Sequence, residues 1–317
     1  MGRVVGLGIA ASFFFAFTFV LNRQMNLGGG SWVWSGVLRF LFMLPMLSLV
    51  VLVRREWRPV LRHIAGRPLA WLGWSTVGFG LFYAPLCAAS VWGPSWLLAA
   101  SWQITIIAGA LLSPLFFQEA RHPGEVRVRH RLPLVPLAWS SLILAGVALL
   151  QWQESAQAPA PTVLAGLGLV VIAAFAYPLG NRKMMQVTGT ALNTTQRVFG
   201  MTLCSLPFWL ALGAAGLAGG QMPDGAQLVQ SANLAHCSGV IATLLFFKAT
   251  NLVKHDLHRL AVVESTQAGE VVFTVLGGVL LFGDRRPDFA GFAGLGLVVL
   301  GMVMNSLSVG RKPKGRD

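Results

Sequence analysis

The chain is a succession of long apolar stretches that short polar or basic segments separate. Ten of the stretches meet or approach the length of about 20 residues that a helix needs to cross the hydrocarbon core of a bilayer. They lie at 4–22, 32–53, 69–91, 95–117, 133–151, 162–180, 191–218, 228–248, 258–282 and 288–309. The pattern predicts an all-α polytopic membrane protein with ten transmembrane helices.

Composition supports the same class. Hydrophobic residues make up 55% of the 317 residues and charged residues only 11%, whereas soluble domains carry about 25% charged residues. The net charge is +13, but the basic residues lie in short loops between apolar stretches, which argues against nucleic-acid binding. The three cysteines lie in apolar stretches without metal-ligand spacing, so we expect neither a metal nor another cofactor.

The distribution of Lys and Arg predicts the orientation in the membrane. If the loops alternate between the two sides, 19 of the 24 Lys and Arg residues fall on one side. Arg23, Arg285 and Arg286 fall on the other side, and Arg39 and Arg197 lie within stretches. Because cytoplasmic loops carry the excess of basic residues, we expect both termini in the cytoplasm, a basic cytoplasmic tail at 310–317, and residence in the plasma (inner) membrane.

The two halves of the chain, 1–151 and 162–309, share polar positions that chance would rarely align. Arg39 corresponds to Arg197 at an offset of 158, Ser101-x-Gln103 to Ser265-x-Gln267 at 164, and Asn22-Arg23 recurs one residue displaced as Asn181-Arg182. Five stretches in each half is an odd number, so the second half must be inverted relative to the first. Inverted repeats are typical of transporters that bind substrate near the midplane, at the interface between the repeats.

Several segments carry a family resemblance. Residues 270–284, EVVFTVLGGVLLFGD, resemble the recurrent Glu-Pro-Val-Phe … Gly-Glu helix of the drug/metabolite transporter superfamily, with Val271 in place of the proline and Asp284 in place of the last glutamate. The segments LNRQM (21–25), SWVWSGVLRFLFMLP (31–45), GFGLFYAPL (78–86) and SWQITIIAG (101–109) resemble the putative multidrug resistance efflux transporter family. The resemblance covers nearly the whole chain. It implies the fold of that superfamily, two inverted five-helix repeats, and efflux of drugs or metabolites.

One departure from the superfamily decides where a coupling carboxylate can lie. The small four-span exporters use a glutamate in their first span, but residues 4–22 contain no acidic residue. Glu270 and Glu264 lie in the apolar stretch 258–282, where a carboxylate is costly and therefore marks a functional or a structurally paired position. We expect Glu270 to carry the proton, with Glu264 as the alternate.

The remaining candidates are expected to contact substrate. They are Gln103, Gln267, Tyr83, Trp102, Tyr177, Arg39 and Arg197. The aromatic rings suit an apolar or cationic compound. The glutamines could instead form hydrogen bonds between helices, and the arginines could extend to the headgroups or pair with Glu264 or Glu270.

These observations predict a secondary active transporter that exports small organic compounds by alternating access, as a proton-coupled antiporter. The sequence contains no Walker A, HExxH or GxSxG motif, which argues against an ATP-driven motor and an enzyme. A membrane-embedded lipid-modifying enzyme and an exchanger or facilitator without proton coupling remain the alternatives. The expected partners are a small-molecule substrate and the lipid bilayer; a homodimer stays open.

Overall fold

The apolar stretches form long helices in the computed structural model, which describes residues 2–116, 132–155, 159–253, 262, 263 and 265–309. In chain order the helices are α1 (Gly2–Leu27), α2 (Trp32–Val53), α3 (Trp57–Gly66), α4 (Pro68–Ser75), α5 (Leu81–Ala89), α6 (Ser95–Trp102), α7 (Ile104–Leu111), α8 (Leu134–Ser155), α9 (Ala160–Thr188), α10 (Thr194–Ala218), α11 (Gly225–Leu234), α12 (Thr243–Val253), α14 (Ala268–Leu276) and α15 (Phe289–Val309). No strand occurs among these residues. In a bilayer a helix satisfies its own backbone hydrogen bonds, which is why such apolar sequences adopt it.

Irregular turns interrupt several of these helices. π-Helical segments η1 (Thr76–Gly80) and η3 (Ala235–Ala242) join α4 to α5 and α11 to α12, and η4 (Gly277–Leu281) extends α14. A short 3₁₀ turn, η2 (Ser113–Leu115), follows α7. The sequence predicted membrane spans over these regions but did not predict the irregular turns within them. π-Helical turns inside α-helices frequently lie at functional sites.

Seven helices of the described part are long and apolar enough to cross a membrane. They are Gly2–Leu27, Trp32–Val53, Pro68–Ala89, Ala160–Thr188, Thr194–Ala218, Gly225–Thr250 and Phe289–Ser308. Ser95–Leu111 and Ala268–Leu281 are shorter apolar helices. The all-helical, multi-pass membrane architecture that the sequence predicted is therefore confirmed.

Polar residues begin the helices at the ends of the bundle. Asn193 precedes α10 and its side chain accepts a hydrogen bond from the backbone N–H of Gln196 at 2.9 Å, while the Gln196 side chain accepts one from the Asn193 N–H at 2.8 Å. Asp224 precedes α11 and accepts from the N–H of Gln227 at 2.6 Å. Such caps satisfy backbone donors that have no partner within the helix.

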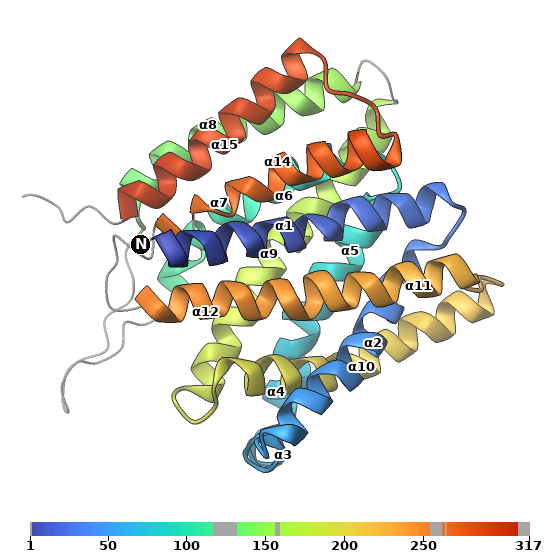
Figure 1. The fold of residues 1–317 in the computed structure, drawn as a ribbon, viewed down its shortest axis with the longest axis vertical. Helices are drawn as coiled ribbons and strands as arrows, with labels where there is room; N and C mark the ends of the chain where they lie inside the picture. The colour runs from blue at the N-terminus through green and yellow to red at the C-terminus, as the bar shows by residue number, and fades with distance from the viewer. Residues whose placement is uncertain (1, 117–131, 156–158, 254–261, 264, 310–317) are drawn as a thin grey trace, which may run out of the picture.

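The bundle packs most closely where glycines meet. Helices α8 and α15 run side by side at one edge of the molecule (Figure 1). A Cβ atom on Gly146 of α8 would lie only 2.6 Å from the carbonyl oxygen of Gly294 on α15. Gly180 of α9 likewise lies against Gly78 of η1, where an added Cβ would come within 2.3 Å of the Gly78 backbone. Small residues of this kind allow membrane helices to approach each other closely.

Helix α3 is an element that the hydropathy pattern did not predict. Its Val60 is fully buried, and His63 accepts a hydrogen bond from the indole N–H of Trp71 in α4 at 3.0 Å. The apolar residues Trp57, Val60 and Ile64 recur at helical spacing, which is the signal that could have identified an amphipathic helix in this basic segment.

Candidate functional site

A cavity of about 520 Å³ lies inside the helix bundle. Its volume falls within the range of about 300–1,000 Å³ that small-molecule sites occupy. The side chains that line it come from both halves of the chain: Phe15, Thr18, Phe19, Arg39, Phe40, Met43, Phe79, Phe82, Leu86, Trp102, Gln103, Thr105, Ile106, Gly109, Ala110, Ser113, Pro133, Tyr177, Pro178, Asn181, Arg182, Val198, Ser238, Gly239, Thr243, Phe246, Gln267, Glu270, Asn305 and Ser306.

Six of the residues that the sequence singled out line this cavity together: Arg39, Trp102, Gln103, Tyr177, Gln267 and Glu270. Tyr83 and Arg197 are not part of the lining. Glu264 lies outside the described residues, as do the basic segment 117–131 and the tail 310–317. Residues far apart in sequence thus line one cavity, whereas Tyr83 and Arg197 lie outside its lining.

The two glutamines occupy matching interruptions in their helices. Gln103 separates α6 from α7 with φ −65° and ψ −10°, and Gln267 precedes α14 with φ −62° and ψ −21°. The carbonyl of Gln103 accepts from the Ile106 N–H at 3.0 Å, and that of Gln267 accepts from the Glu270 N–H at 2.9 Å. Each bond spans three residues, the tighter 3₁₀ spacing. Glu270 therefore occupies in the second half the position of Ile106 in the first.

Glu270 is a buried carboxylate in the first turn of α14, with only 6% of its surface exposed. The side chain of Gln103 is placed to donate a hydrogen bond to it, and the second amide hydrogen of Gln103 is available for the Ala99 carbonyl, 3.1 Å away. Within the described residues no ion pair joins Glu270 to Arg39 or to Arg197. Among the described residues, Glu270 therefore does not form the arginine pairing that the sequence suggested, and Gln103 is its hydrogen-bond partner instead.

Arg39 is also buried, with 7% of its surface exposed, so it does not extend to the headgroups. Its guanidinium carbon lies 4.1 Å from the centre of the Tyr83 ring, and Nη2 donates to the Ser238 hydroxyl at 3.1 Å. Nε and Nη1 are buried without a hydrogen-bond partner. Tyr83 is in turn fixed by Asn22, whose amide donates to its hydroxyl at 2.9 Å. The tyrosine thus supports Arg39 and does not line the cavity.

Arg197 differs from its repeat partner. It is half-buried near the start of α10 and lies outside the cavity lining. Tyr177, by contrast, lines the cavity together with Glu270 and Arg39. The tyrosine therefore lies among the charged groups of the site.

Aromatic rings form one wall of the cavity. The ring centroid of Phe82 lies 5.1 Å from that of Trp102 and 4.8 Å from that of Tyr177. The centroids of Trp102 and Tyr177 are 5.6 Å apart. Tyr177 lies within α9, yet 37% of its surface is exposed. Because Tyr177 lines the cavity, that exposed surface is accessible to a ligand inside the bundle.

Among the described residues, the cavity extends to one end of the bundle. Its lining includes Ser113, Pro133 and Ser306, which lie where α7 ends, α8 begins and α15 ends, at the same end as the N-terminus (Figure 1). Two polar residues that the sequence singled out only as a repeat, Asn181 and Arg182, line the cavity as well. Nη1 of Arg182 donates to the Gly109 carbonyl at 2.6 Å. The Asn-Arg repeat was the signal that could have marked them as site residues.

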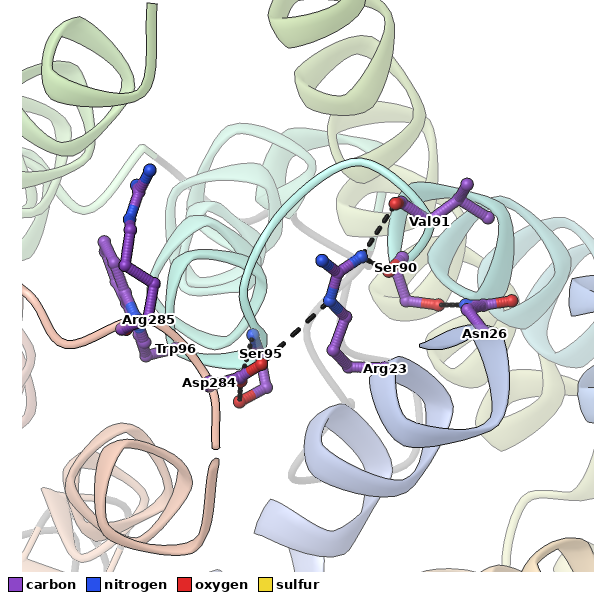
Figure 2. A network of polar contacts seen from close by, with 8 residues as sticks. All are labelled: Arg23, Asn26, Ser90, Val91, Ser95, Trp96, Asp284 and Arg285. Atoms are coloured by element: carbon purple, nitrogen blue, oxygen red, sulfur yellow. Dashed lines mark hydrogen bonds and ion pairs between the residues drawn. The ribbon is translucent and has the colours of Figure 1, made fainter. Parts of the chain in front are cut away.

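The opposite end is closed by polar contacts between the halves of the chain (Figure 2). Asp284 accepts hydrogen bonds from the Ser95 N–H, at 2.8 Å, and from the Ser95 hydroxyl. Arg23 lies 4.0 Å from Asp284 and donates to the carbonyls of Ser90 and Val91 at 3.3 Å and 2.8 Å.

A second ion pair strengthens the same end. Arg285 forms a pair of 2.5 Å with Glu154 at the end of α8, and its carbonyl accepts from the Trp96 indole N–H at 2.8 Å (Figure 2). None of the residues in these contacts lines the large cavity. The described residues therefore extend the cavity toward one end of the bundle and place these polar contacts at the other end.

Comparison with known proteins agrees with this architecture. A solved crystal structure of a protein superposes with a TM-score of 0.63 over 98% of both chains, at 14% identity, which shows a shared fold. The Bacillus subtilis protein "Uncharacterized protein YjlA" is 49% identical over 98% of this chain and 97% of its own length. The Shouchella clausii "Uncharacterized 42.1 kDa protein in intracellular alkaline protease 3'region" is 45% identical over 83% of this chain and 69% of its own length.

The family described as "Putative multidrug resistance efflux transporter" matches residues 2–311. That match covers nearly the whole chain, including both halves of the cavity and both closing ion pairs. The resemblance that the sequence segments indicated is thereby confirmed, and a transporter family is not a family of enzymes. The chain belongs to the putative multidrug resistance efflux transporter family of the drug/metabolite transporter superfamily.

Proposed function

We propose that this protein exports small organic compounds by alternating access, with a proton exchanged at Glu270. The observation that carries the proposal is a cavity of about 520 Å³, closed at one end, with a buried carboxylate in its wall. Glu270 is the carboxylate among the described lining residues. A proton and a substrate that both bind there exclude each other, and this competition couples their movements in opposite directions. Glu264 is the alternate.

The proposed topology has ten crossings, with both termini in the cytoplasm of the inner membrane. Two features support an inverted relation between 1–151 and 162–309. The interruptions at Gln103 and Gln267 match, with equivalent 3₁₀ hydrogen bonds. The third apolar helix of each half also contains a π-helical segment, η1 in one and η3 in the other. With the basic loops inside, the open end of the cavity faces the cytoplasm, as an exporter that is ready to load substrate requires.

The closed end supports alternating access. The contact of Asp284 with Ser95 links the second half to the first, and the pair of Arg285 with Glu154 links the second half to the end of α8. Export requires these contacts to open and the cytoplasmic mouth to close. The same cavity would also serve an exchanger without protons, so the experiment must separate transport from coupling.

Counterflow in proteoliposomes, screened with aromatic cations, amino acids and organic acids, measures transport without a driving force. We expect Glu270→Gln, which resembles the protonated carboxyl, to lose accumulation driven by a pH gradient and to weaken counterflow, because the protonated form excludes substrate. Glu56→Gln is the matched control, because Glu56 lies outside the cavity and its side chain accepts from Asn193, as a glutamine oxygen also can. Full pH-driven accumulation by Glu270→Gln and by Glu264→Gln would contradict proton coupling at either residue.

A further inference from the structure

We propose that the substrate is a zwitterion with an apolar body, whose ammonium group binds beside Glu270 and whose carboxylate binds at Arg39. The proposal rests on the function proposed above and names the class of compound that the same cavity takes. It depends on a separate observation, which is that the Arg39 guanidinium and the Glu270 carboxyl group line one cavity without forming an ion pair with each other.

The first step concerns these charges. The charged side chains of the described lining are Arg39, Arg182 and Glu270. Arg39 has a tyrosine ring and a serine hydroxyl as neighbours, and Glu270 has a glutamine. Burying an ionic group without an opposite charge is costly. A ligand that carries both complementary charges would compensate Arg39 and Glu270 at once.

The second step concerns the ammonium end. Glu270 lies in the same lining as Trp102 and Tyr177, whose rings contact each other at 5.6 Å. A carboxyl group that lines the same cavity as aromatic rings attracts a cation by charge, and the rings add cation–π interaction. Gln103 adds an amide that can accept a hydrogen bond from an ammonium group through its oxygen.

The third step concerns the carboxylate end. Arg39 has two nitrogens, Nε and Nη1, without a hydrogen-bond partner. Buried polar groups nearly always have partners, so these donors call for an explanation. The hydroxyls of Ser238 and Thr18 also line the cavity and lie 2.5 Å from each other. A small shift of the guanidinium off the Tyr83 ring would let a carboxylate accept from Arg39 and from one of these hydroxyls.

The fourth step is selection. A ligand with only a positive charge is attracted by Glu270 but repelled by Arg39. A ligand with only a negative charge is attracted by Arg39 but repelled by Glu270. Only a compound with both charges is matched at both places. Phe40, Phe79 and Phe82 complete the lining with apolar surface, which suits a hydrocarbon or aromatic body between or beside the charged ends. Tyr177 lines the same cavity as Arg39 and Glu270.

Matched compounds test this inference directly. Phenylalanine, 2-phenylethylamine and 3-phenylpropionate share a phenyl ring. Phenylalanine carries both charges, 2-phenylethylamine carries only the ammonium, and 3-phenylpropionate carries only the carboxylate. Tryptophan, tryptamine and indole-3-propionate repeat the comparison with a larger body. Binding to the full-length protein in detergent is measured by the shift in melting temperature at increasing ligand concentration. We expect the zwitterion of at least one series to bind about tenfold more tightly than both of its partners.

Two variants assign the ends. Arg39→Gln should abolish the preference for the zwitterion over the amine, and Glu270→Gln should abolish its preference over the acid. Arg58→Gln is the control, because Arg58 lies in α3, outside the cavity. Should Arg39→Gln fail to fold, Arg39→Lys retains the charge and should keep a reduced preference for the zwitterion.

The results separate this inference from the proposed function. Equal or tighter binding of the amines, or no binding of either zwitterion, would overturn the zwitterion assignment, and pH-driven export of another compound would then leave the transporter proposal intact. Conversely, charge-dependent selection of zwitterions without any response to a pH gradient would support the substrate class and contradict proton coupling.

Discussion

At the scale of single residues, the position of Arg39 depends on a neighbour that does not touch the cavity. Tyr83 is fully buried and lies under the guanidinium at 4.1 Å, while Asn22 donates to its hydroxyl. A cation–π contact is worth about 0.5–2 kcal/mol, depending on how dry its surroundings are. The ring is therefore a positioning element for the charge that we assign to substrate recognition.

Replacing Tyr83 should separate the roles of its ring and its hydroxyl. Tyr83→Leu removes the ring below Arg39, and we expect it to weaken zwitterion binding by about tenfold, since 1.4 kcal/mol corresponds to a factor of ten. Tyr83→Phe keeps the ring and loses the bond from Asn22, so its effect should be mainly a loss of about 1 kcal/mol in stability. Binding titrations and thermal unfolding check the two variants, and equal binding losses would contradict this division.

The sequence predicted Glu270, the glutamine pair and Arg39 as site residues because polar groups inside apolar stretches are costly and therefore stand out. It did not predict that Tyr83 would lie behind Arg39, nor that Arg197 would lie outside the cavity lining. Those outcomes depend on which face of each helix the packing turns inward, and the sequence around Tyr83 and Arg197 leaves that face undetermined.

At the scale of elements, close helix packing depends on a few glycines. Gly146 and Gly294 bring α8 and α15 together, and a Cβ on Gly146 would lie 2.6 Å from the carbonyl oxygen of Gly294. Gly296 of the same helix pair has no atom within 4 Å of an added Cβ. The two positions make a matched comparison of a crowded and an open glycine.

We expect Gly146→Ala to destabilise the protein by about 1–3 kcal/mol, the usual cost of overpacking. Gly296→Ala should be neutral or slightly stabilising, because alanine favours helix. Melting temperatures in detergent measure both changes. A similar loss of stability in the two variants would show that the α8–α15 contact is looser than its geometry indicates.

The interruptions in the helices were the least predictable feature of the elements. Hydropathy gave the apolar segments around Gln103 and Gln267, and the Ser-x-Gln match related them, but no pattern predicted the 3₁₀ bonds that follow each glutamine. Over one or two residues, an α-helical turn and a 3₁₀ turn bury the same apolar side chains, so hydropathy does not distinguish them. The choice between them therefore depends on contacts with neighbouring helices.

At the scale of the whole molecule, contacts between distant parts of the chain close one end of the cavity. Asp284 and Ser95 are 189 residues apart, and Arg285 and Glu154 are 131 apart. The sequence placed Arg23 and Arg285 on the outer side, but it gave no indication that they would hold the halves together. Pairing over such separations follows from the packed bundle and cannot be read from local patterns.

Loss of the Asp284 contacts should open this end more often. Each hydrogen bond to a charged group contributes about 1.5–3 kcal/mol, so Asp284→Asn should shift the population toward the outward-open state. Cys87 is a native probe, because it is fully buried and lies beside Asn22. With Cys204 and Cys237 replaced by serine, an impermeant maleimide added outside should label Cys87 several-fold faster. Arg286→Gln, an exposed change in the same loop, is the control, and an equal labelling rate would contradict the closing role.

The orientation of the molecule can be tested with two further cysteines on a background without the native ones. Met222 lies between α10 and α11 and is 76% exposed, so Met222→Cys should react with an impermeant reagent from outside the cell. Arg58→Cys in α3 should react only after the membrane is permeabilised. The reverse pattern would place both termini outside and would turn the cavity mouth away from the cytoplasm.

The repeat that relates Gln103 to Gln267 makes Ile106 of the first half equivalent to Glu270 of the second half. The described cavity wall therefore has a carboxyl group at this position in one half and a hydrocarbon side chain in the other. One acid accommodates one proton in each cycle. If a zwitterion leaves without net charge while that proton enters, every turnover carries one positive charge into the cell. The membrane voltage would then drive export directly, with about 2.3 kcal/mol for each 100 mV, and transport would produce an electrical current even without a pH difference.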